Sequence, residues 1–220
     1  MITVYGEGRG FRVVWLLEEM GLPYKLRRVD LLAGVENDPE FLAINPAGFI
    51  PAIRDGEVTM VESIAIMEYL VARYGPTPLA PSASDTVFPA YQQFLHLGEA
   101  GLAASIYFVN ASRNIAPEEE KQNWGGRFAM EVFQSRRGLV TRRLAHSPYM
   151  AGDVFTAADI SVTYALELAQ RGGSVALSDI ELSYLARTTH REGYLRAMAN
   201  CHDTRAWVAK ITSERNKGEA

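Results

Sequence analysis

The first third of the chain alternates between short apolar runs of strand length and longer runs whose apolar residues recur at helical spacing. Strands are predicted at residues 2–5 and 24–31, and a hairpin around Asp55-Gly56 is predicted at 50–61. Helices are predicted at 11–21, 38–45 and 62–75, because proline or a small polar residue begins them or glycine ends them. The order β-α-β-α-β-β-α indicates a small α/β domain over residues 1–75.

The rest of the chain has a different pattern. Residues 76–86 are rich in Pro, Ser, Thr and Asp and are predicted to form a linker. Beyond it the spacing is helical throughout, which predicts an all-α domain over 87–220. Helices are expected at 87–113, from Pro117, from Phe155 and from Leu177, the last with Ser178 and Glu181 at capping-box spacing. The arginine pairs at 136–137 and 142–143 are predicted to lie on a solvated helix face.

Composition narrows the function classes. The 220 residues carry a net charge of −4 with both signs interspersed, so no basic surface for nucleic acid is expected. No apolar run reaches membrane-spanning length, and residues 1–20 do not resemble a secretion signal. One cysteine, Cys201, fits a reducing cytoplasm, and four scattered histidines predict no metal site.

The segment "VYGEGRGFRVVWLLEEMG" at 4–21 reads as strand, glycine-rich turn and helix, the frame of a nucleotide-binding loop. A dinucleotide fold needs repeated βαβ units, but strand-like segments end near residue 60. The third glycine of the fingerprint would stand at Phe11, and the chain has no Gly-Lys-Ser/Thr. The loop is therefore not expected to bind a nucleotide.

Several separate segments together resemble the cytosolic glutathione transferases. They are "LLEEMGLPYKL" at 16–26, "INPAGFIPAIRDG" at 44–56, "MVESIAIMEYL" at 60–70, "YMAGDVFTAADISV" at 149–162 and "SYLARTTHREGYLRAM" at 183–198. The resemblance covers nearly the whole chain and implies a thioredoxin-like domain followed by an all-helical one. It also implies glutathione as co-substrate, no metal, a cytoplasmic homodimer and a role in detoxification.

Two of these segments carry the expected glutathione-binding residues. In "GFIPAI", Pro51 can simply begin a strand, whereas the resemblance implies a cis bond after Ile50 that presents the Ile50 backbone to the cysteinyl part of glutathione. In "MVESIA", Glu62 and Ser63 can cap a helix. The resemblance adds binding of the γ-glutamyl group, its carboxylate by Ser63 and its ammonium by Glu62.

The family's thiolate-stabilising residue is missing from its usual place. Bacterial and fungal relatives that begin with "xRV" usually have serine there, but here the position is Gly10. One remaining source is Tyr5 at the end of the first strand. The other is the helix start, with the N–H groups of Phe11 and Arg12, the helix dipole and the charge of Arg9 or Arg12. Tyr5 can equally be a structural aromatic, so both sources stay open.

Three further assignments follow from the resemblance. Phe49 stands at the glycine end of glutathione, where many relatives have lysine, and cannot supply that charge. Phe11 and Tyr107 are expected to line a pocket for the electrophile, although Tyr107 can also be a core residue. Thr156 and Asp159 form a capping box with a structural role and no catalytic one.

The expected function is transfer of the glutathione thiolate to a small apolar electrophile. One alternative is reduction of peroxides or disulfides with glutathione as the electron source. Another is a protein that binds glutathione or other ligands and has little or no activity, which Gly10 and Phe49 favour.

Overall fold

The computed structural model describes residues 1–31, 34–171 and 175–201. The chain divides into two compact units, called unit 1 and unit 2 below. Unit 1 comprises Met1–Met67 and the chain from Glu192 onward, and unit 2 comprises Glu68–Arg191. Nothing in the described residues fixes the domain boundaries predicted at 75 and 86, which stay predictions.

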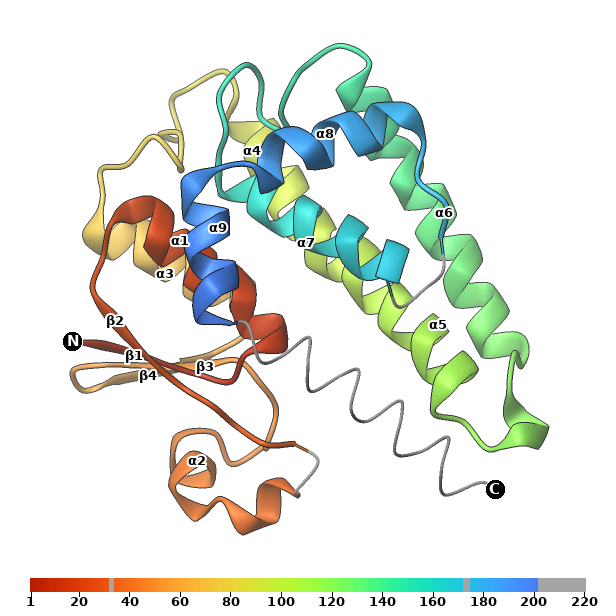
Figure 1. The fold of residues 1–220 in the computed structure, drawn as a ribbon. Coiled ribbons are helices and arrows are strands. Elements are labelled where there is room, and N and C mark those ends of the chain that lie inside the picture. The colour runs from red at the N-terminus through yellow and green to blue at the C-terminus, as the bar shows by residue number, and fades with distance from the viewer. Residues whose placement is uncertain (32–33, 172–174, 202–220) are drawn as a thin grey trace. The chain divides into compact units, whose positions relative to one another are not determined.

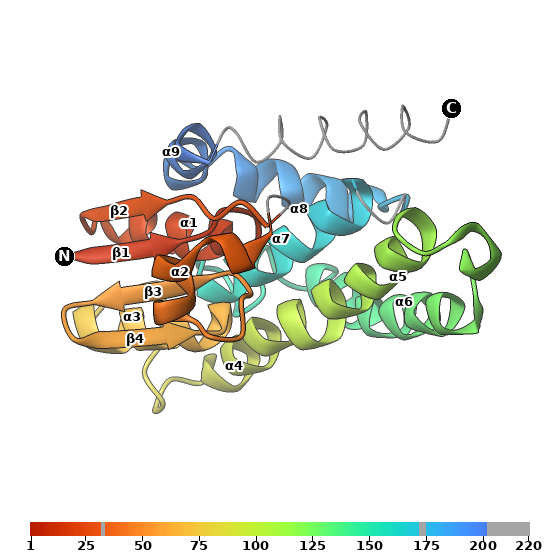
Figure 2. The ribbon, with the colours of Figure 1, turned by 90° about the horizontal axis from the view of Figure 1, so that it is seen from below.

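Unit 1 is built on a four-stranded mixed sheet in the order β2-β1-β3-β4, in which β1 runs parallel to β2 and antiparallel to β3 (Figure 2). Helix α2 lies on the face of the sheet opposite to α1 (Figure 1). The strands are β1 (Ile2–Tyr5), β2 (Tyr24–Arg27), β3 (Ala52–Asp55) and β4 (Val58–Val61). The helices are α1 (Phe11–Met20), α2 (Pro39–Ile44), α9 (Glu192–Asn200) and α3 (Ser63–Tyr74), which continues into unit 2.

The sheet alternates its side chains between two cores. Tyr5 and its partner Ala52 point toward α2, where they meet the buried ring of Phe41. The neighbouring pair Val4 and Ile53 points to the other face, and both side chains are fully buried. The period of two therefore places β1 and β3 at the centre of the unit.

Helix α1 ends as the sequence predicts. Gly21 adopts a left-handed conformation with φ of 64°, and the N–H of Leu22 donates to the Leu17 carbonyl. Helix α9 packs on α1 through Tyr194, whose ring meets the edge of Trp15 with centroids 4.9 Å apart. Arg196 adds an ion pair of 2.9 Å to Glu18.

In its described residues, unit 2 is helical. Its helices are α4 (Phe88–His96), α5 (Ala104–Asn114), α6 (Trp124–Leu144), α7 (Ala157–Arg171) and α8 (Asp179–Thr189). The long helix predicted at 87–113 is interrupted by a π-helical segment, Leu97–Ala103, between α4 and α5. Gly98 lies against Ser161 of the buried helix α7, so closely that a Cβ on Gly98 would be 2.2 Å from the Ser161 hydroxyl oxygen.

The helix predicted from Pro117 is wrong in its start. Residues Glu118–Glu120 form a 3₁₀ turn, and α6 begins at Trp124. Gln122 has a positive φ of 53°, which breaks the helical path, and the Asn123 side chain accepts the Gly126 N–H at 3.0 Å. The physical start signal was therefore the asparagine cap and not the proline.

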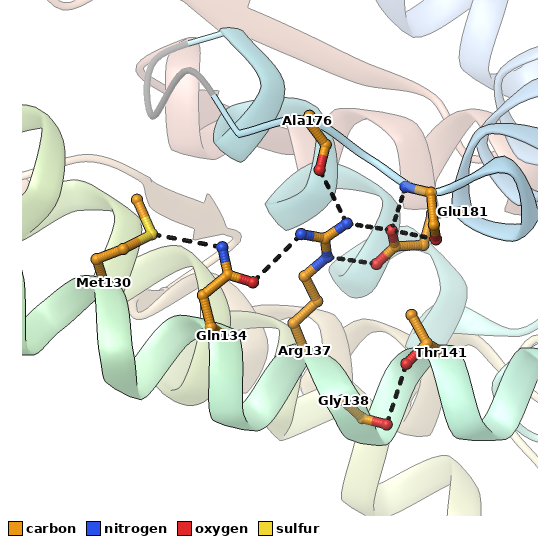
Figure 3. A network of polar contacts seen from close by, with 8 residues as sticks. Met130, Gln134, Arg137, Gly138, Thr141, Ala176 and Glu181 are labelled. Carbon is orange, nitrogen blue, oxygen red and sulfur yellow. Dashed lines mark hydrogen bonds and ion pairs between the residues drawn. The ribbon is translucent and has the colours of Figure 1, made fainter.

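A buried ion pair joins α6 to α8 (Figure 3). The Arg137 Nε donates to Glu181 at 2.6 Å, and Arg137 also donates to the Ala176 carbonyl at 3.0 Å. Glu181 is fully buried, and it accepts the Ser178 N–H and hydroxyl, which confirms the predicted capping box. The prediction that residues 136–137 lie on a solvated face is wrong for Arg137, because its charge neutralises this buried carboxylate.

The predicted fold class is confirmed: a mixed sheet with flanking helices comes first, and a helical region follows it. Residues 76–86, the predicted linker, form turns between α3 and α4. Across the described ranges, no helix has both the length and the apolar character needed to cross a bilayer.

Candidate functional site

Three segments leave the sheet of unit 1 at the same end. Tyr5, the last residue of β1, pairs with Ala52, the first residue of β3, and Ala52 pairs with Val61, the last residue of β4. The loop after β1, the Ile50-Pro51 turn before β3 and the start of α3 after β4 therefore lie side by side. These three segments hold the residues that the sequence analysis assigned to glutathione.

The glycine-rich loop packs directly on the Ile50-Pro51 turn. Gly6 has φ of +84°, and a Cβ on it would lie 2.3 Å from the Ile50 side chain. A Cβ on Gly10 would lie 3.3 Å from the Pro51 Cβ. Gly6 therefore allows a positive φ, and both glycines allow the loop to approach the neighbouring turn closely. The glycines of this loop are therefore explained by packing, and no bound nucleotide phosphate is needed to account for them.

The peptide bond between Ile50 and Pro51 is cis, as predicted. Among the described backbone hydrogen bonds, none is donated by the Ile50 N–H. Asn45, which the sequence analysis missed, shapes this turn: its side-chain NH₂ donates to the Phe49 carbonyl at 2.6 Å, and its side-chain oxygen accepts the Ala47 N–H at 3.1 Å. The signal was an asparagine directly before a Pro-Ala-Gly turn.

The start of α3 combines strain with an unused hydroxyl. Glu62 is exposed and has φ of 69°, a region that a residue with a Cβ adopts only when its surroundings enforce it. Its carbonyl accepts the Ile66 N–H at 2.9 Å, which places Glu62 at the N-cap of the helix. Ser63, the first residue of α3, is 4% exposed, and its hydroxyl oxygen is not among the fully buried atoms that lack a hydrogen-bond partner.

The start of α1 is extended by a 3₁₀ turn, Gly8–Gly10. The Gly10 and Phe11 N–H groups donate to the carbonyls of Glu7 and Gly8, so a thiolate at Phe11 would compete with an existing bond. Gly10 has φ of −69°, which any residue can adopt, and no side chain caps the helix. Of the two candidate arginines, Arg12 is fully buried and Arg9 is partly exposed.

Tyr5 has the surroundings of a structural aromatic. It is 5% exposed, and its ring centroid lies 6.2 Å from that of Phe41 on α2. The Arg27 guanidinium lies 5.6 Å from the centre of the Tyr5 ring. Strand pairing, aromatic packing and the arginine together hold the ring in the core beneath the turn, so packing alone accounts for an aromatic here.

The remaining predicted residues are spread over both units. Phe49 is 38% exposed beside the Ile50 turn in unit 1. Phe11 is buried in unit 1 against Trp15 and Tyr194. Tyr107 belongs to α5 in unit 2, where it is 50% exposed. An electrophile pocket shared by Phe11 and Tyr107 stays a prediction.

Thr156 and Asp159 stand at the start of α7, in unit 2. The Asp159 carboxylate accepts the Met150 and Thr156 N–H groups, both at 2.8 Å, and the Tyr184 hydroxyl at 3.0 Å. Burial raises the pKa of Asp159 to about 6, in spite of these hydrogen bonds. Because the Asp159 oxygens accept hydrogen bonds from its own chain, this carboxylate stabilises the start of α7.

The chain is similar to known proteins along most of its length. Residues 2–72 match the family described as "Glutathione S-transferase, N-terminal domain". Glutathione S-transferase 3 of Schizosaccharomyces pombe is 30% identical over 174 residues, covering 74% of this chain and 71% of that protein. These matches show that the chain belongs to the glutathione S-transferase family.

Solved structures show the same fold. The structure titled "Ternary complex of BphK, a bacterial GST" has a TM-score of 0.79 at 24% identity and covers 91% of this chain and 99% of that one. A theta class enzyme of Xanthomonas axonopodis pv. citri, described "with glutathione bound", has a TM-score of 0.76 at 24% identity, covering 89% and 96%. At this identity the likeness concerns the fold alone.

Proposed function

We propose that this protein is a glutathione transferase that binds glutathione at the three-segment edge of unit 1 and transfers its thiolate to a small apolar electrophile. The observation that carries the proposal is the Ser63 hydroxyl. It lies on an almost fully buried residue at a helix start and makes no hydrogen bond within the described chain. The Ser63 oxygen is not one of the fully buried polar atoms that lack a partner, so a ligand carboxylate can reach it and accept its hydrogen bond.

The γ-glutamyl end of glutathione matches the start of α3 at both of its charges. The carboxylate accepts from the Ser63 hydroxyl and from the N–H groups of the first helical turn, whose dipole favours a negative charge. The ammonium pairs with the exposed carboxylate of Glu62. The unused N–H of Ile50 then binds the backbone of the cysteinyl residue and directs its sulfur toward the loop after β1.

For the thiolate we propose the helix start at Gly8–Gly10 and not Tyr5. The 3₁₀ turn moves the positive end of α1 back by one turn. Among the described backbone hydrogen bonds of this loop, none is donated by the Gly8 N–H. Tyr5 is already accounted for by packing against Phe41 and Arg27. A thiol pKa lowered by about two units requires about 2.7 kcal/mol of differential interaction, which the Gly8 N–H and the helix dipole can share.

Binding is tested by calorimetry with glutathione on the wild type and Ser63→Ala. The variant is expected to bind about 1–3 kcal/mol more weakly, because a charge-assisted hydrogen bond is lost. Ser84→Ala, at an exposed serine in the turns before α4, is the control and is expected to bind like the wild type. Equal affinity of Ser63→Ala and the wild type would remove Ser63 from the site.

Chemistry is tested separately from binding. The thiolate absorbance of bound glutathione is recorded across pH, and turnover is measured with a chlorodinitrobenzene as the electrophile. A thiol pKa below that of free glutathione together with thioether formation is the expected result. Normal binding with no pKa shift and no product would contradict the transferase proposal.

That last outcome would instead support the second candidate, a glutathione-binding protein with little or no activity. It is favoured by Gly10, which supplies no hydroxyl, and by the buried position of Tyr5. The reductase alternative has less support. Burial raises the pKa of Cys201 to about 12, so this cysteine is a neutral thiol at neutral pH and a poor nucleophile.

We also propose that the protein is a homodimer, on the ground of its family membership. A two-fold dimer of this chain has twice the monomer mass of 24.4 kDa. Sedimentation at micromolar concentration is expected to give the doubled mass. A single species at the monomer mass would contradict the assignment.

A further inference from the structure

The residue that precedes the start of α1 is an acid, Glu7. It belongs to the loop after β1 and stands directly before the 3₁₀ turn, and its carbonyl accepts the Gly10 N–H at 3.1 Å. Its neighbours Gly6 and Gly8 both lie close to the Ile50 side chain, from which a Cβ on Gly8 would be 3.5 Å away. Glu7 is therefore part of the three-segment edge of unit 1, next to the N–H groups proposed for the thiolate.

An acid in this place is unfavourable for a second anion. Glu7 is the N-cap residue of the 3₁₀ turn, but within the described chain its side chain caps none of the N–H groups of that turn. The side chain is 9% exposed, so water screens its charge poorly. A carboxylate at the positive end of a helix competes with a thiolate for the same dipole and repels it.

The Glu7 carboxylate is paired with a cation at the end of β2. Arg28 directly follows that strand, and its Nε donates to a Glu7 carboxylate oxygen at 2.9 Å. The Gly6 N–H donates to the Arg27 carbonyl at 2.8 Å, which holds the loop beside the strand end. The Arg28 side chain is 61% exposed, so a solvated cation compensates a shielded anion.

A thiol already present in unit 1 is subject to both charges. Burial, and next the Glu7 carboxylate, raise the pKa of Cys201 to about 12, whereas the Arg28 guanidinium acts to lower it. Glu18 of α1 also acts to raise it. The titratable groups described in this neighbourhood are thus Arg28 after β2, Cys201 after α9, Glu18 on α1 and, in the turn itself, Arg9.

We propose that Arg28 is a positioning residue of the transferase, which holds and neutralises the Glu7 carboxylate and so lets glutathione ionise at the start of α1. The inference rests on the proposed function, because it concerns the thiolate placed there. Arg28 acts through Glu7 and needs no contact with the sulfur. Its charge-assisted hydrogen bond keeps the carboxylate on the side of β2 and leaves the Gly8 N–H to the ligand.

The test is the thiolate absorbance of bound glutathione across pH, recorded on variants of the full-length protein. Arg28→Met is expected to raise the thiol pKa by about one unit, which leaves about tenfold less thiolate at a pH below the pKa and lowers kcat by a similar factor. Glu7→Gln is expected to lower the pKa below that of the wild type, because the Arg28 charge remains. The affinity of both variants for glutathione, measured by calorimetry, is expected to remain that of the wild type.

Three further variants separate charge from structure. Arg28→Lys keeps the charge and is expected to restore most of the wild-type pKa. The double variant of Glu7→Gln and Arg28→Met removes both charges and is expected to have a thiol pKa between those of the single variants. A merely structural role would leave the double variant at least as impaired as Arg28→Met. Arg54→Met, at an exposed arginine toward the hairpin end of β3, is the control and is expected to keep the wild-type pKa.

The possible failures are distinguishable. A wild type that binds glutathione at the thiol pKa of the free peptide would contradict the proposed function, and this inference with it. A lowered pKa in the wild type that Arg28→Met and Glu7→Gln both leave unchanged would overturn this inference alone. Weaker glutathione binding by Arg28→Met at an unchanged pKa would also overturn it, by making Arg28 a direct contact of the ligand. If circular dichroism shows Arg28→Met to be unfolded, Glu7→Gln decides, and a pKa at or above the wild-type value overturns the inference.

Discussion

Two helix starts of unit 2, those of α7 and α8, differ from two of unit 1, those of α1 and α3, in what satisfies them. In unit 2, α7 and α8 each begin beneath a fully buried carboxylate, Asp159 or Glu181, which accepts hydrogen bonds from its own chain. In unit 1, α1 begins at Gly10 with no side-chain cap, and α3 begins at Ser63 with an unbonded hydroxyl in the described chain. A helix start closed by its own side chains holds the fold together, and one left open can bind an anion.

The two closed starts also differ from each other. Glu181 has the Arg137 guanidinium beside it, whereas Asp159 is held by N–H and hydroxyl donors. Burial acts to raise both pKa values. For Glu181 the hydrogen bonds from Arg137 and Ser178 outweigh burial and lower the pKa, and for Asp159 burial prevails. A buried cation therefore decides the sign of the shift.

Removing that cation is expected to have the largest effect. Arg137→Met leaves Glu181 buried without its counter-charge and is expected to cost about 3–5 kcal/mol of unfolding free energy at pH 7. Urea denaturation measures it, with Arg136→Met on the exposed neighbouring arginine as the control. The cost is expected to shrink toward pH 5, because the pKa of Glu181 rises in the variant and the carboxyl takes up a proton. A cost below about 1 kcal/mol would contradict the role of the pair.

Asp159→Asn comes next, with an expected loss of about 2 kcal/mol at pH 7, because the new amide cannot accept from every donor. The pH dependence of this loss has the opposite sign to that of Arg137→Met, because the loss grows as the pH falls. The folded pKa of Asp159, about 6, is above its ordinary value of 3.8, so the folded wild type binds the proton first. Stability contributed by Asp159 rises as pH falls through 6, by up to about 1.4 kcal/mol per pH unit.

The advantage of the wild type over Asp159→Asn is therefore expected to widen between pH 7 and pH 5. Denaturation at both pH values measures this difference, and Asp153→Asn in the preceding loop is the control. An advantage that narrows in this interval would show that the hydrogen bonds to Asp159, and not its burial, set its pKa.

A third change closes an open helix start. Gly10→Ser is conformationally allowed, since φ is −69°. The added Cβ would lie 3.3 Å from the Pro51 Cβ, so Pro51 has to move by a few tenths of an ångström. Relative to Gly10→Ala, which adds the same Cβ without a hydroxyl, serine is expected to lower the pKa of bound glutathione by about one unit, worth about 1.4 kcal/mol. Thiolate absorbance measures this. Equal pKa values in the two variants would show that the hydroxyl does not reach the sulfur.

The smallest effect is expected for Tyr5→Phe. Phenylalanine keeps the packing against Phe41 and the ring beneath Arg27, so the thiolate pKa and the turnover are expected to remain those of the wild type. The same absorbance titration measures it. An increase of one or two units in the pKa of bound glutathione would return the thiolate role to Tyr5 and remove it from the open helix start.

Sequence alone determined the local structure of this protein where a residue type has one dominant local consequence. Gly21 ends α1 in the left-handed conformation, Asp38 accepts the Phe41 N–H at the start of α2, and Ser178 pairs with Glu181 at α8. These signals depend on neighbours within a few residues, so no knowledge of the fold is needed. The order of elements, and with it the fold class, followed from them.

Tertiary structure decided which of these residues meet. Arg137 and Tyr5 have ordinary local surroundings in the sequence, but one neutralises a carboxylate 44 positions away and the other is packed against α2. Likewise, the contact of Gly6 with Ile50 and the buried, unbonded hydroxyl of Ser112 exist only once distant segments are brought together. Burial and the identity of the long-range partner set the charge, the pKa and the availability of a side chain, and neither is encoded within a local window.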